Sequence, residues 1–221
     1  FLLFRLLREA PYVCPASLAQ RSLLFDPAAH RWNEGLCMAF GIDPGSLPAP
    51  SPDLAEFGLL PVGDREVPLR LCAGDQNLLP AALSLGPGEA VVNLGTGAFL
   101  LAGADAVEPD LQHSVLPGAA APSALVLEGT VNGAASALGW WSDQGHRIVS
   151  PSPPSAADTP HFLDSVGGLG SPIWRSGLAP RFSHPPRSAG EGQAAVSDAV
   201  VHLLQRTLER MRAAEIGRAH V

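Results

Sequence analysis

The sequence predicts a layered α/β fold, because strand-like and helix-like segments alternate along its 221 residues. Residues 89–94 and 98–102 are apolar runs joined by Gly-Thr-Gly, which is typical of a β-hairpin. Residues 124–129 form another short apolar run. Residues 192–214 place Val and Leu at intervals of three and four, which is typical of an amphipathic helix that covers a sheet.

The first part of the chain predicts short elements joined by loops. Residues 1–10 indicate the end of a helix. Asn33 is expected to cap a helix over residues 34–40, and Gly41 stands where a glycine ends a helix. Residues 43–61 are rich in Pro and Gly and predict a loop with one strand.

Two further helices are expected after this loop. Residues 67–73 read as a strand, and residues 76–85 have helical character. Thr130 or Asn132 is expected to cap a helix that runs to about Trp141, because their side chains accept hydrogen bonds from free N–H groups at a helix start.

Composition excludes several classes of function. Fourteen basic residues stand against 21 acidic ones, for a net charge of −7, which argues against a nucleic-acid partner. All fourteen are arginine, so a Walker-A loop or a Schiff-base lysine is absent from this stretch. The apolar start is too short to span a bilayer, so no membrane partner is expected.

The cysteines and histidines indicate no metal site. Cys14, Cys37 and Cys72 are widely spaced, and no Cys-x-x-Cys pair occurs. The seven histidines form no zinc-binding pattern. Unpaired cysteines of this kind are typical of a reducing cytoplasm.

The Gly74-Asp75-Gln76 segment follows a buried strand and begins a helix. An acid at such a rigid position can accept a proton from a substrate hydroxyl. The amide of Gln76 can hold a polyol hydroxyl by donating and accepting hydrogen bonds. The alternative is that Asp75 is only the cap of the helix.

The Gly95-Thr96-Gly97 turn leaves backbone N–H groups uncovered, and the threonine adds a hydroxyl donor. Such a turn can hold phosphate oxygens without lysine. The alternative is an ordinary hairpin turn. Small residues from Gly133 to Ala135 indicate either close approach of a ligand or close packing of a helix.

The order and spacing of these motifs resemble the FGGY carbohydrate kinase family, and within it the glycerol kinase branch. The resemblance covers about residues 10–180. It rests on Gly-Asp-Gln, Asn-Leu-Gly-Thr-Gly-Ala-Phe-Leu-Leu, Leu-Glu-Gly-Thr-Val and Gly-Leu-Gly-Ser-Pro-Ile-Trp. The segment Ser17–Asp26 with Trp32 is similar to a further family segment, Ser-x-Ala-x-Arg-Thr-Leu-Leu-Phe-Asp followed by Trp.

The resemblance implies part of an actin-like ATPase fold, also called ribonuclease H-like, with the active site between two domains. Residues 1–86 would end the substrate domain, and residues 87–215 would begin the nucleotide domain. Residues 216–221 look like a tail derived from a sequencing adapter. The chain is expected to be an internal fragment, inactive alone, because the first phosphate loop, the sugar clamp and the adenine-binding motif are missing.

The same resemblance implies the roles of the site residues. Asp75 would be the general base, and Gln76 would contact a polyol or sugar. Thr96, with Gly95 and Gly97, would bind the phosphates of ATP, bridged by Mg²⁺. Ala135 would border the nucleotide at a position where the family has glycine, and Gly139 stands in place of a family glutamine.

Alternatives remain for the activity. The parent protein could be another sugar kinase of the family, of the xylulose or gluconate type, or a non-catalytic actin-like binding protein. The presence of Asp75 beside Gln76 favours an enzyme. A homo-oligomer is possible.

Overall fold

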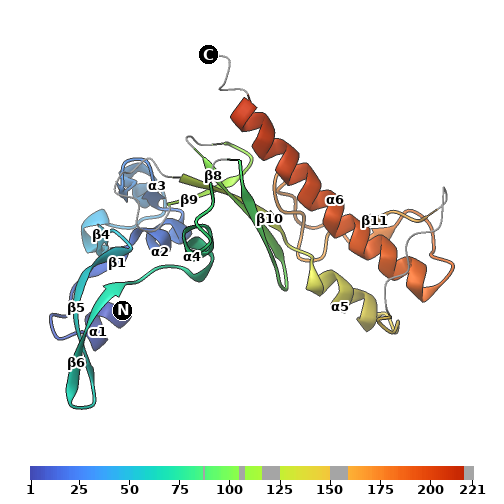
Figure 1. Cartoon of the computed structure of the whole chain (residues 1–221). Helices are drawn as coiled ribbons and strands as arrows, with labels where there is room; N and C mark the ends of the chain where they lie inside the picture. Colours follow the sequence, from blue (N-terminus) through green and yellow to red (C-terminus); the bar gives the residue numbers. More distant parts are fainter. Residues whose placement is uncertain (87, 105–107, 116–124, 150–158, 217–221) are drawn as a thin grey trace. The chain divides into compact units, whose positions relative to one another are not determined.

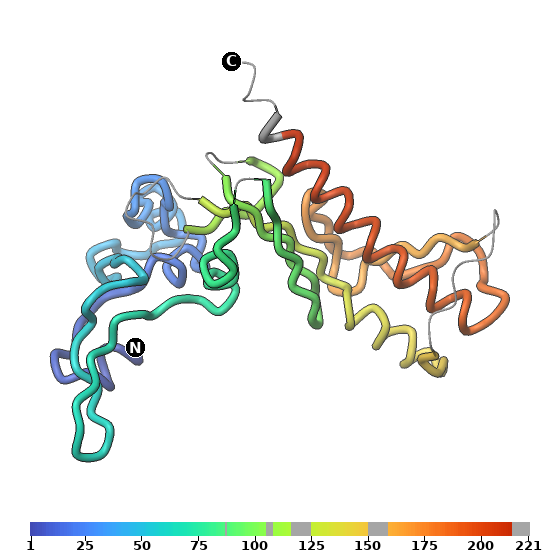
Figure 2. The backbone as a smooth tube through the Cα atoms, in the orientation of Figure 1, coloured from blue at the N-terminus to red at the C-terminus, as the bar shows by residue number. Residues whose placement is uncertain are grey.

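The computed structural model describes residues 1–86, 88–104, 108–115, 125–149 and 159–216. It divides into two compact units (Figures 1 and 2). The first unit comprises Phe1–Glu89, Gly103–Val107 and His113–Val126, and the second comprises Ala90–Ala102, Glu108–Gln112 and Leu127–Val221. The domain boundary between residues 86 and 87 stays a prediction.

The first unit consists of short helices and paired strands. Its elements are α1 (Leu2–Leu6), β1 (Val13–Pro15), α2 (Ala16–Ala19), the 3-10 turn η1 (Gln20–Ser22), β2 (Phe25–Asp26), β3 (Arg31–Trp32), α3 (Glu34–Ala39), η2 (Pro44–Ser46), β4 (Ala49–Ser51), β5 (Leu54–Val62), β6 (Arg65–Leu71) and α4 (Asp75–Ala82). Strand β1 pairs with β4 in parallel, whereas β2–β3 and β5–β6 are antiparallel.

The prediction for α3 is confirmed. The side chain of Asn33 caps the helix by accepting a 3.0 Å hydrogen bond from the N–H of Leu36. Gly41 follows the helix with a φ of +69°, a conformation that glycine adopts without strain.

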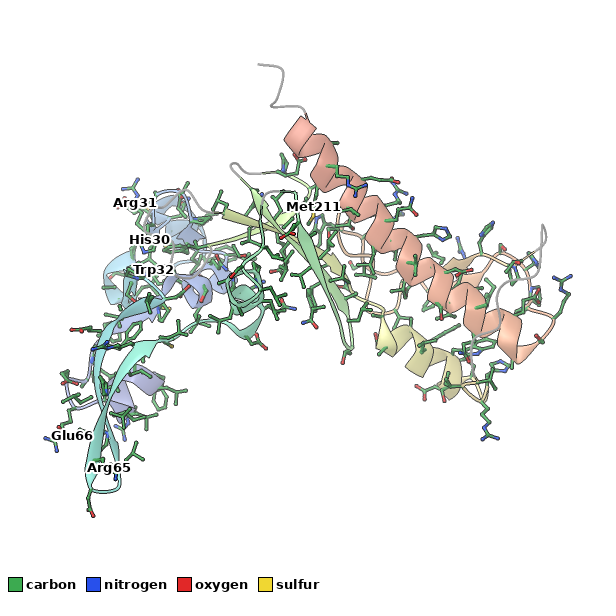
Figure 3. The ribbon with its side chains drawn as sticks, viewed as in Figure 1. His30, Arg31, Trp32, Arg65, Glu66 and Met211 are labelled. Atoms are coloured by element: carbon green, nitrogen blue, oxygen red, sulfur yellow. The ribbon has the colours of Figure 1, made fainter. Side chains whose placement is uncertain are left out.

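Two strands, β4 and most of β5, lie in residues 43–61, which corrects the expectation of one strand there. The strand expected over residues 67–73 is β6, which pairs with β5 in a long hairpin. Its two strands meet at Gly63-Asp64, and Gly63 has a φ of +60°. Figure 3 labels Arg65 and Glu66 at the start of β6. Glycine followed by aspartate is a recognised two-residue hairpin signal, so the sequence held the information.

The second unit contains a sheet and two long helices. The elements after α4 are β7 (Ala90–Leu94), β8 (Ala98–Ala104), β9 (Gln112–Val115), β10 (Leu125–Val131), α5 (Ala135–Asp143), β11 (Phe162–Leu163), β12 (Arg181–Phe182) and α6 (Ala189–Ile216). Of these, most of β9, the end of β8 and the start of β10 belong to the first unit. The four strands of the sheet lie in the order β7-β8-β10-β9. The residues of these strands are divided between the two units as given above. The predicted β7–β8 hairpin is confirmed, with Leu94 opposite Ala98.

The predicted helix at residues 192–214 is confirmed as α6, which begins earlier than expected (Figure 1). Val196 is fully buried and packs with Trp141 of α5 and Phe162 of β11. One turn further on, Val200 packs with Ala98 of β8. The apolar face of α6 therefore supports the strands and the helix that flank the Gly95–Gly97 turn.

The predicted cap of α5 is wrong. Thr130 lies inside β10, and α5 begins at Ala135 after the backbone of Ala134, which has no side-chain cap. Neither Thr130 nor Asn132 caps this helix, because its first N–H groups bind the Gly95–Gly97 turn, as described below.

No helix in the described ranges is long and apolar enough to cross a membrane.

Candidate functional site

Asp75 is the first residue of α4, after β6 and three linking residues. The strand β6 is largely exposed, which corrects the expectation of a buried strand before Asp75. The N-cap position belongs to Gly74, so the interpretation of Asp75 as the cap is wrong. The carboxylate of Asp75 is exposed, and its Oδ1 accepts a 2.8 Å hydrogen bond from the N–H of Gln76. Gln76 is half-buried beside it. The acid is therefore fixed at a helix start while it stays open to a substrate.

The backbone before Asp75 is held by residues that lie far away in the sequence. Gly74 donates its N–H to Ser17 Oγ at 2.9 Å. Ser17 in turn donates to Asp53 Oδ1, both from its N–H at 3.0 Å and from its hydroxyl at 2.8 Å. Asp53 is 3% exposed, and burial raises the pKa of its carboxyl. Sequence reasoning did not find Asp53, because no local pattern marks it.

In the second unit, the Gly95–Gly97 turn is anchored by its carbonyl groups. The carbonyl of Gly95 accepts from the N–H of Ala135 at 3.0 Å. The carbonyl of Thr96 accepts from the N–H groups of Ala134 and Ser136, each at 3.1 Å, and from the Ser136 hydroxyl at 2.9 Å. These bonds satisfy the start of α5, which explains why that helix needs no capping side chain.

The N–H of Gly95 donates to the carbonyl of Gly97 at 2.8 Å, so only the N–H groups of Thr96 and Gly97 can be open in this turn. In the described part of the chain, no hydrogen bond starts from the N–H of Thr96 or Gly97. Thr96 is exposed, so its hydroxyl is also open to a ligand. A turn whose carbonyls are used and which has two open N–H groups is suited to an anion.

The structure thus brings four of the predicted site residues together. Gly95, Thr96 and Gly97 lie against Ala135, which is exposed at the start of α5. Asp75 and Gln76 form the other group, in the first unit.

Two glycines, Gly129 inside β10 and Gly133 after it, allow close packing. A Cβ atom added to Gly129 would overlap the methyl of Thr207 on α6, and one added to Gly133 would overlap the carboxylate of Asp164. Of the two interpretations of these small residues, packing is therefore correct for Gly129 and Gly133. Ala135 lies outside this packing, on the exposed side of α5.

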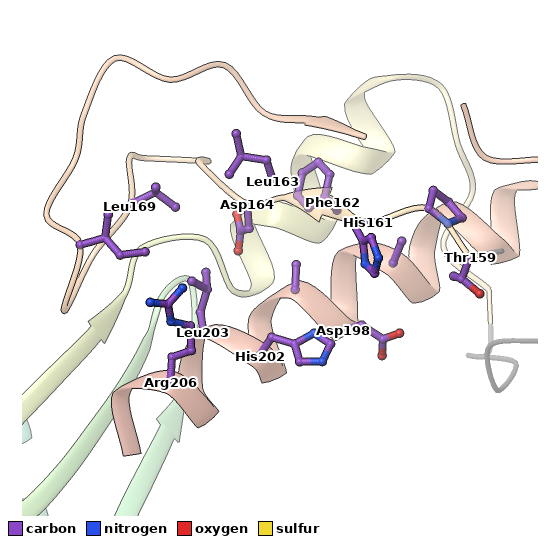
Figure 4. A pocket seen from close by; sticks show the side chains of 14 residues that line it. Thr159, His161, Phe162, Leu163, Asp164, Leu169, Asp198, His202, Leu203 and Arg206 are labelled. Atoms are coloured by element: carbon purple, nitrogen blue, oxygen red, sulfur yellow. The ribbon is translucent and has the colours of Figure 1, made fainter. Parts of the chain in front are cut away.

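A pocket of ≈ 290 Å³ lies between α6 and residues 159–173 (Figure 4). It is lined by Asp164 and by His202 and Arg206 of α6, and by none of the predicted site residues. Asp164 is 3% exposed and its Oδ2 has no hydrogen-bond partner. Burial raises the pKa of Asp164 to about 6.

The described residues contain no cluster of three or more His, Cys, Asp or Glu side chains that could hold a metal ion. Mg²⁺ in nucleotide sites is bound largely by phosphate oxygens and water, so it needs no such cluster. Cys14, Cys37 and Cys72 are free, and burial raises the thiol pKa of Cys14 and Cys72. Raised pKa values make these thiols poor nucleophiles.

Comparison with known proteins gives consistent relatives. The glycerol kinase of Shewanella frigidimarina is 30% identical over 191 residues, which cover 79% of this chain and 37% of that protein. The solved structure of Plasmodium falciparum glycerol kinase with ADP matches with a TM-score of 0.80 at 21% identity, over 96% of this chain and 46% of that one. A ligand-bound xylulose kinase from Lactobacillus acidophilus matches with a TM-score of 0.72 at 18% identity, over 95% and 46%.

The chain is homologous to glycerol kinases over most of its length, and its structural neighbours are sugar kinases of the FGGY type. Its fold is part of the actin-like ATPase fold of these FGGY kinases. No protein-family model matches the chain, so the assignment rests on the individual relatives. The chain spans 34% to 42% of the length of the curated relatives it matches.

Proposed function

We propose that the protein containing this chain is an ATP-dependent kinase that transfers the γ-phosphoryl group of ATP to a hydroxyl of glycerol or a similar polyol. The observation that carries the proposal is the exposed carboxylate of Asp75, fixed at the start of α4 and followed by Gln76. The glycerol kinase relatives support the choice of a polyol.

In this reaction Asp75 is the general base. The substrate oxygen forms a bond to the γ-phosphorus while the bond from that phosphorus to the β,γ-bridging oxygen breaks, and ADP leaves. The hydroxyl proton passes to the carboxylate of Asp75. Gln76 holds a neighbouring hydroxyl, since an amide can both donate and accept hydrogen bonds.

The Gly95–Gly97 turn holds the phosphates of ATP. The N–H groups of Thr96 and Gly97 and the Thr96 hydroxyl supply donors, and Ala135 borders the nucleotide with its small side chain. Mg²⁺ bound to the phosphates neutralises the charge that develops during transfer. The residues described here contribute hydrogen bonds around that charge, not a ready-made metal site.

A second candidate substrate is a sugar or sugar acid. Xylulose kinases and a gluconate kinase are among the proteins with similar folds. They resemble the chain at 14% to 21% identity, below the 30% of the glycerol kinase relative, so the polyol is the better proposal. A non-catalytic binding protein would have no use for an open acid beside Gln76.

The decisive experiment is Asp75→Asn in the intact protein, with phosphorylation of glycerol, xylulose and gluconate measured in parallel. We expect kcat to fall about 100- to 10,000-fold, the typical contribution of a general base, with nucleotide binding retained. Asp64→Asn is the matched control, because Asp64 is an exposed acid in the β5–β6 turn. Transfer by Asp75→Asn at the rate of the control would exclude Asp75 as the base.

Further properties belong to the same proposal. We expect the 221 residues alone to be inactive, because the kinases they match are more than twice as long. We expect a cytoplasmic protein, in line with three free cysteines. Size-exclusion chromatography of the intact protein tests for a homo-oligomer.

A further inference from the structure

The roles proposed above for Asp75 and Gln76 do not involve the segment Ser17–Arg21. In the structure this segment forms α2 and η1, and it reaches the start of α4 at two points. Ser17 is fully buried, which is unusual for a polar side chain unless its hydrogen bonds are satisfied. Its hydroxyl lies between Asp53 and Gly74.

The direction of these hydrogen bonds is fixed. Gly74 can only donate its N–H, so Ser17 Oγ accepts there. The hydroxyl proton of Ser17 then points to Asp53 Oδ1, which also accepts from the N–H of Ser17. These hydrogen bonds connect the buried carboxylate of Asp53, through the Ser17 hydroxyl, to the N–H of Gly74, the residue before Asp75. We call this chain of hydrogen bonds the relay.

Asp53 holds the same short segment a second time. Its carbonyl oxygen accepts a 2.9 Å hydrogen bond from the N–H of Cys72. Cys72 and Gly74 lie on either side of a single residue, and Asp75 comes next. The backbone leading to Asp75 is thus pinned at two points by one residue located between β4 and β5.

The other end of the segment ties down the first turn of α4. Arg21 donates from its guanidinium to Asn77 Oδ1 at 3.2 Å. Asn77 is 2% exposed, and a Cβ added to Gly74 would lie 3.0 Å from the same oxygen. Glycine at position 74 therefore lets Asn77 close over the helix start.

The burial of Asp53 lowers the stability of the fold, so a purely structural role does not explain it. Asp53 is almost fully buried, and its Oδ2 has no partner among the described residues. Burying such a group without full hydrogen bonding costs stability. Features of this kind persist where function requires a fixed geometry.

We propose that Ser17 and Asp53 are positioning residues, which hold the backbone before Asp75 so that its carboxylate meets the substrate hydroxyl in reacting geometry. This inference rests on the proposed function. A displacement of about 1 Å at a reacting group can lower the rate about 100-fold, so a relay of three hydrogen bonds can control catalysis without touching the substrate.

The first test is Ser17→Ala in the intact protein, assayed at a temperature where circular dichroism shows it folded. We expect kcat to fall about 10- to 100-fold, while KM for ATP stays within about twofold because the Gly95–Gly97 turn is untouched. Ser22→Ala is the matched control. Ser22 ends η1, directly after the Ser17–Arg21 segment, and its hydroxyl bonds to the carbonyl of Ala19 and the N–H of Leu24 instead of the residues before Asp75, so kcat should stay near wild type.

A second pair of variants decides the matter if Ser17→Ala does not fold. Asp53→Asn keeps an oxygen that accepts from Ser17, and should keep most of kcat. Asp53→Ala removes that oxygen and should lose kcat as Ser17→Ala does. Equal kcat in both Asp53 variants would overturn the relay.

Comparison with Asp75→Asn separates this inference from the proposed function. If Asp75→Asn keeps the wild-type rate, the proposed base is wrong, whatever Ser17→Ala does. If Asp75→Asn is impaired, positioning through Asp75 predicts that adding Ser17→Ala lowers the residual rate no further. An equal further loss in that background would show that Ser17 affects the rate independently of Asp75, which would overturn the proposal. An unchanged kcat in Ser17→Ala alone would show that these hydrogen bonds serve stability only.

Discussion

The N–H of Ala135 donates a 3.0 Å hydrogen bond to the carbonyl oxygen of Gly95. This bond joins the start of α5 to a turn located 40 residues earlier in the chain. Together with the bonds that Ala134 and Ser136 donate to Thr96, it occupies the carbonyls of Gly95 and Thr96, while the N–H groups of Thr96 and Gly97 donate no bond within the described residues. Open N–H groups of this kind can bind an anion.

Gly97→Ala tests the turn directly. A Cβ added there would lie 3.0 Å from the carbonyl oxygen of Val131 and 3.4 Å from that of Asn132, so the turn has to shift. We expect KM for ATP to rise about 10-fold or more, since displaced donors no longer converge on phosphate oxygens. KM for the polyol should change little. Initial-rate kinetics of the intact protein measures both.

Gly103→Ala is the control for that experiment. Gly103 lies in β8, the strand that begins directly after Gly97, and an added Cβ meets nothing within 4 Å. An equal KM for ATP in Gly97→Ala and Gly103→Ala would argue against phosphate binding at the turn.

The turn also shows what the sequence could and could not predict. The β7–β8 hairpin, the Asn33 cap and α6 are set by local patterns, and all three are confirmed. The predicted cap of α5 is wrong, because the first N–H groups of this helix donate to the carbonyls of Gly95 and Thr96, and no local pattern reveals that contact. Local preference for Thr and Asn as caps gave way to a tertiary contact.

The same distinction holds for the candidate site. The sequence placed Asp75 at a helix start and the Gly95–Gly97 turn in a hairpin, because glycine and short polar residues punctuate elements locally. It did not find Asp53 or Asp164, which become buried only through contacts with residues distant in the chain.

Gly129→Ala should destabilise the second unit. The added methyl would overlap the Thr207 side chain, at the contact between β10 and α6. Overpacking of this kind costs about 1–3 kcal/mol. The urea-unfolding midpoint, followed by the fluorescence of Trp140 and Trp141, measures the loss.

Gly139→Ala gives the opposite expectation. Gly139 lies inside α5, is exposed, and an added Cβ meets nothing within 4 Å. Alanine in a helix interior is favoured over glycine by about 0.5–1 kcal/mol, so this variant should be more stable than the wild type. A Gly129→Ala variant as stable as Gly139→Ala would contradict the tight packing of α6.

Asp164 should make stability depend on pH. Its pKa rises from 3.8 to about 6 on folding, so the folded protein holds this proton more tightly than the unfolded chain. The free energy of unfolding is highest below pH 3.8, where Asp164 is protonated in both states. It falls as the pH rises to about 6, because the unfolded chain releases this proton first. The loss amounts to about 3 kcal/mol.

Asp164→Asn removes the charge at every pH. The gain in stability over the wild type should therefore grow between pH 4 and pH 7 and then level off, as measured by urea unfolding at each pH. Asp143→Asn, at the exposed end of α5, should show no such growth. A pH-independent difference for Asp164→Asn would mean that the group titrates alike in both states.

Gln76→Ala tests the proposed substrate contact separately from the base. Gln76 is half-buried next to Asp75, and its N–H, not its side chain, bonds to the Asp75 carboxylate. Alanine keeps that N–H, so the carboxylate should stay in place and kcat should fall less than in Asp75→Asn. Loss of the amide should raise KM for the polyol about 10-fold, the effect of one hydrogen bond of about 1.5 kcal/mol, and leave KM for ATP unchanged. If KM for ATP rose and KM for the polyol did not, Gln76 would have to be assigned to the nucleotide.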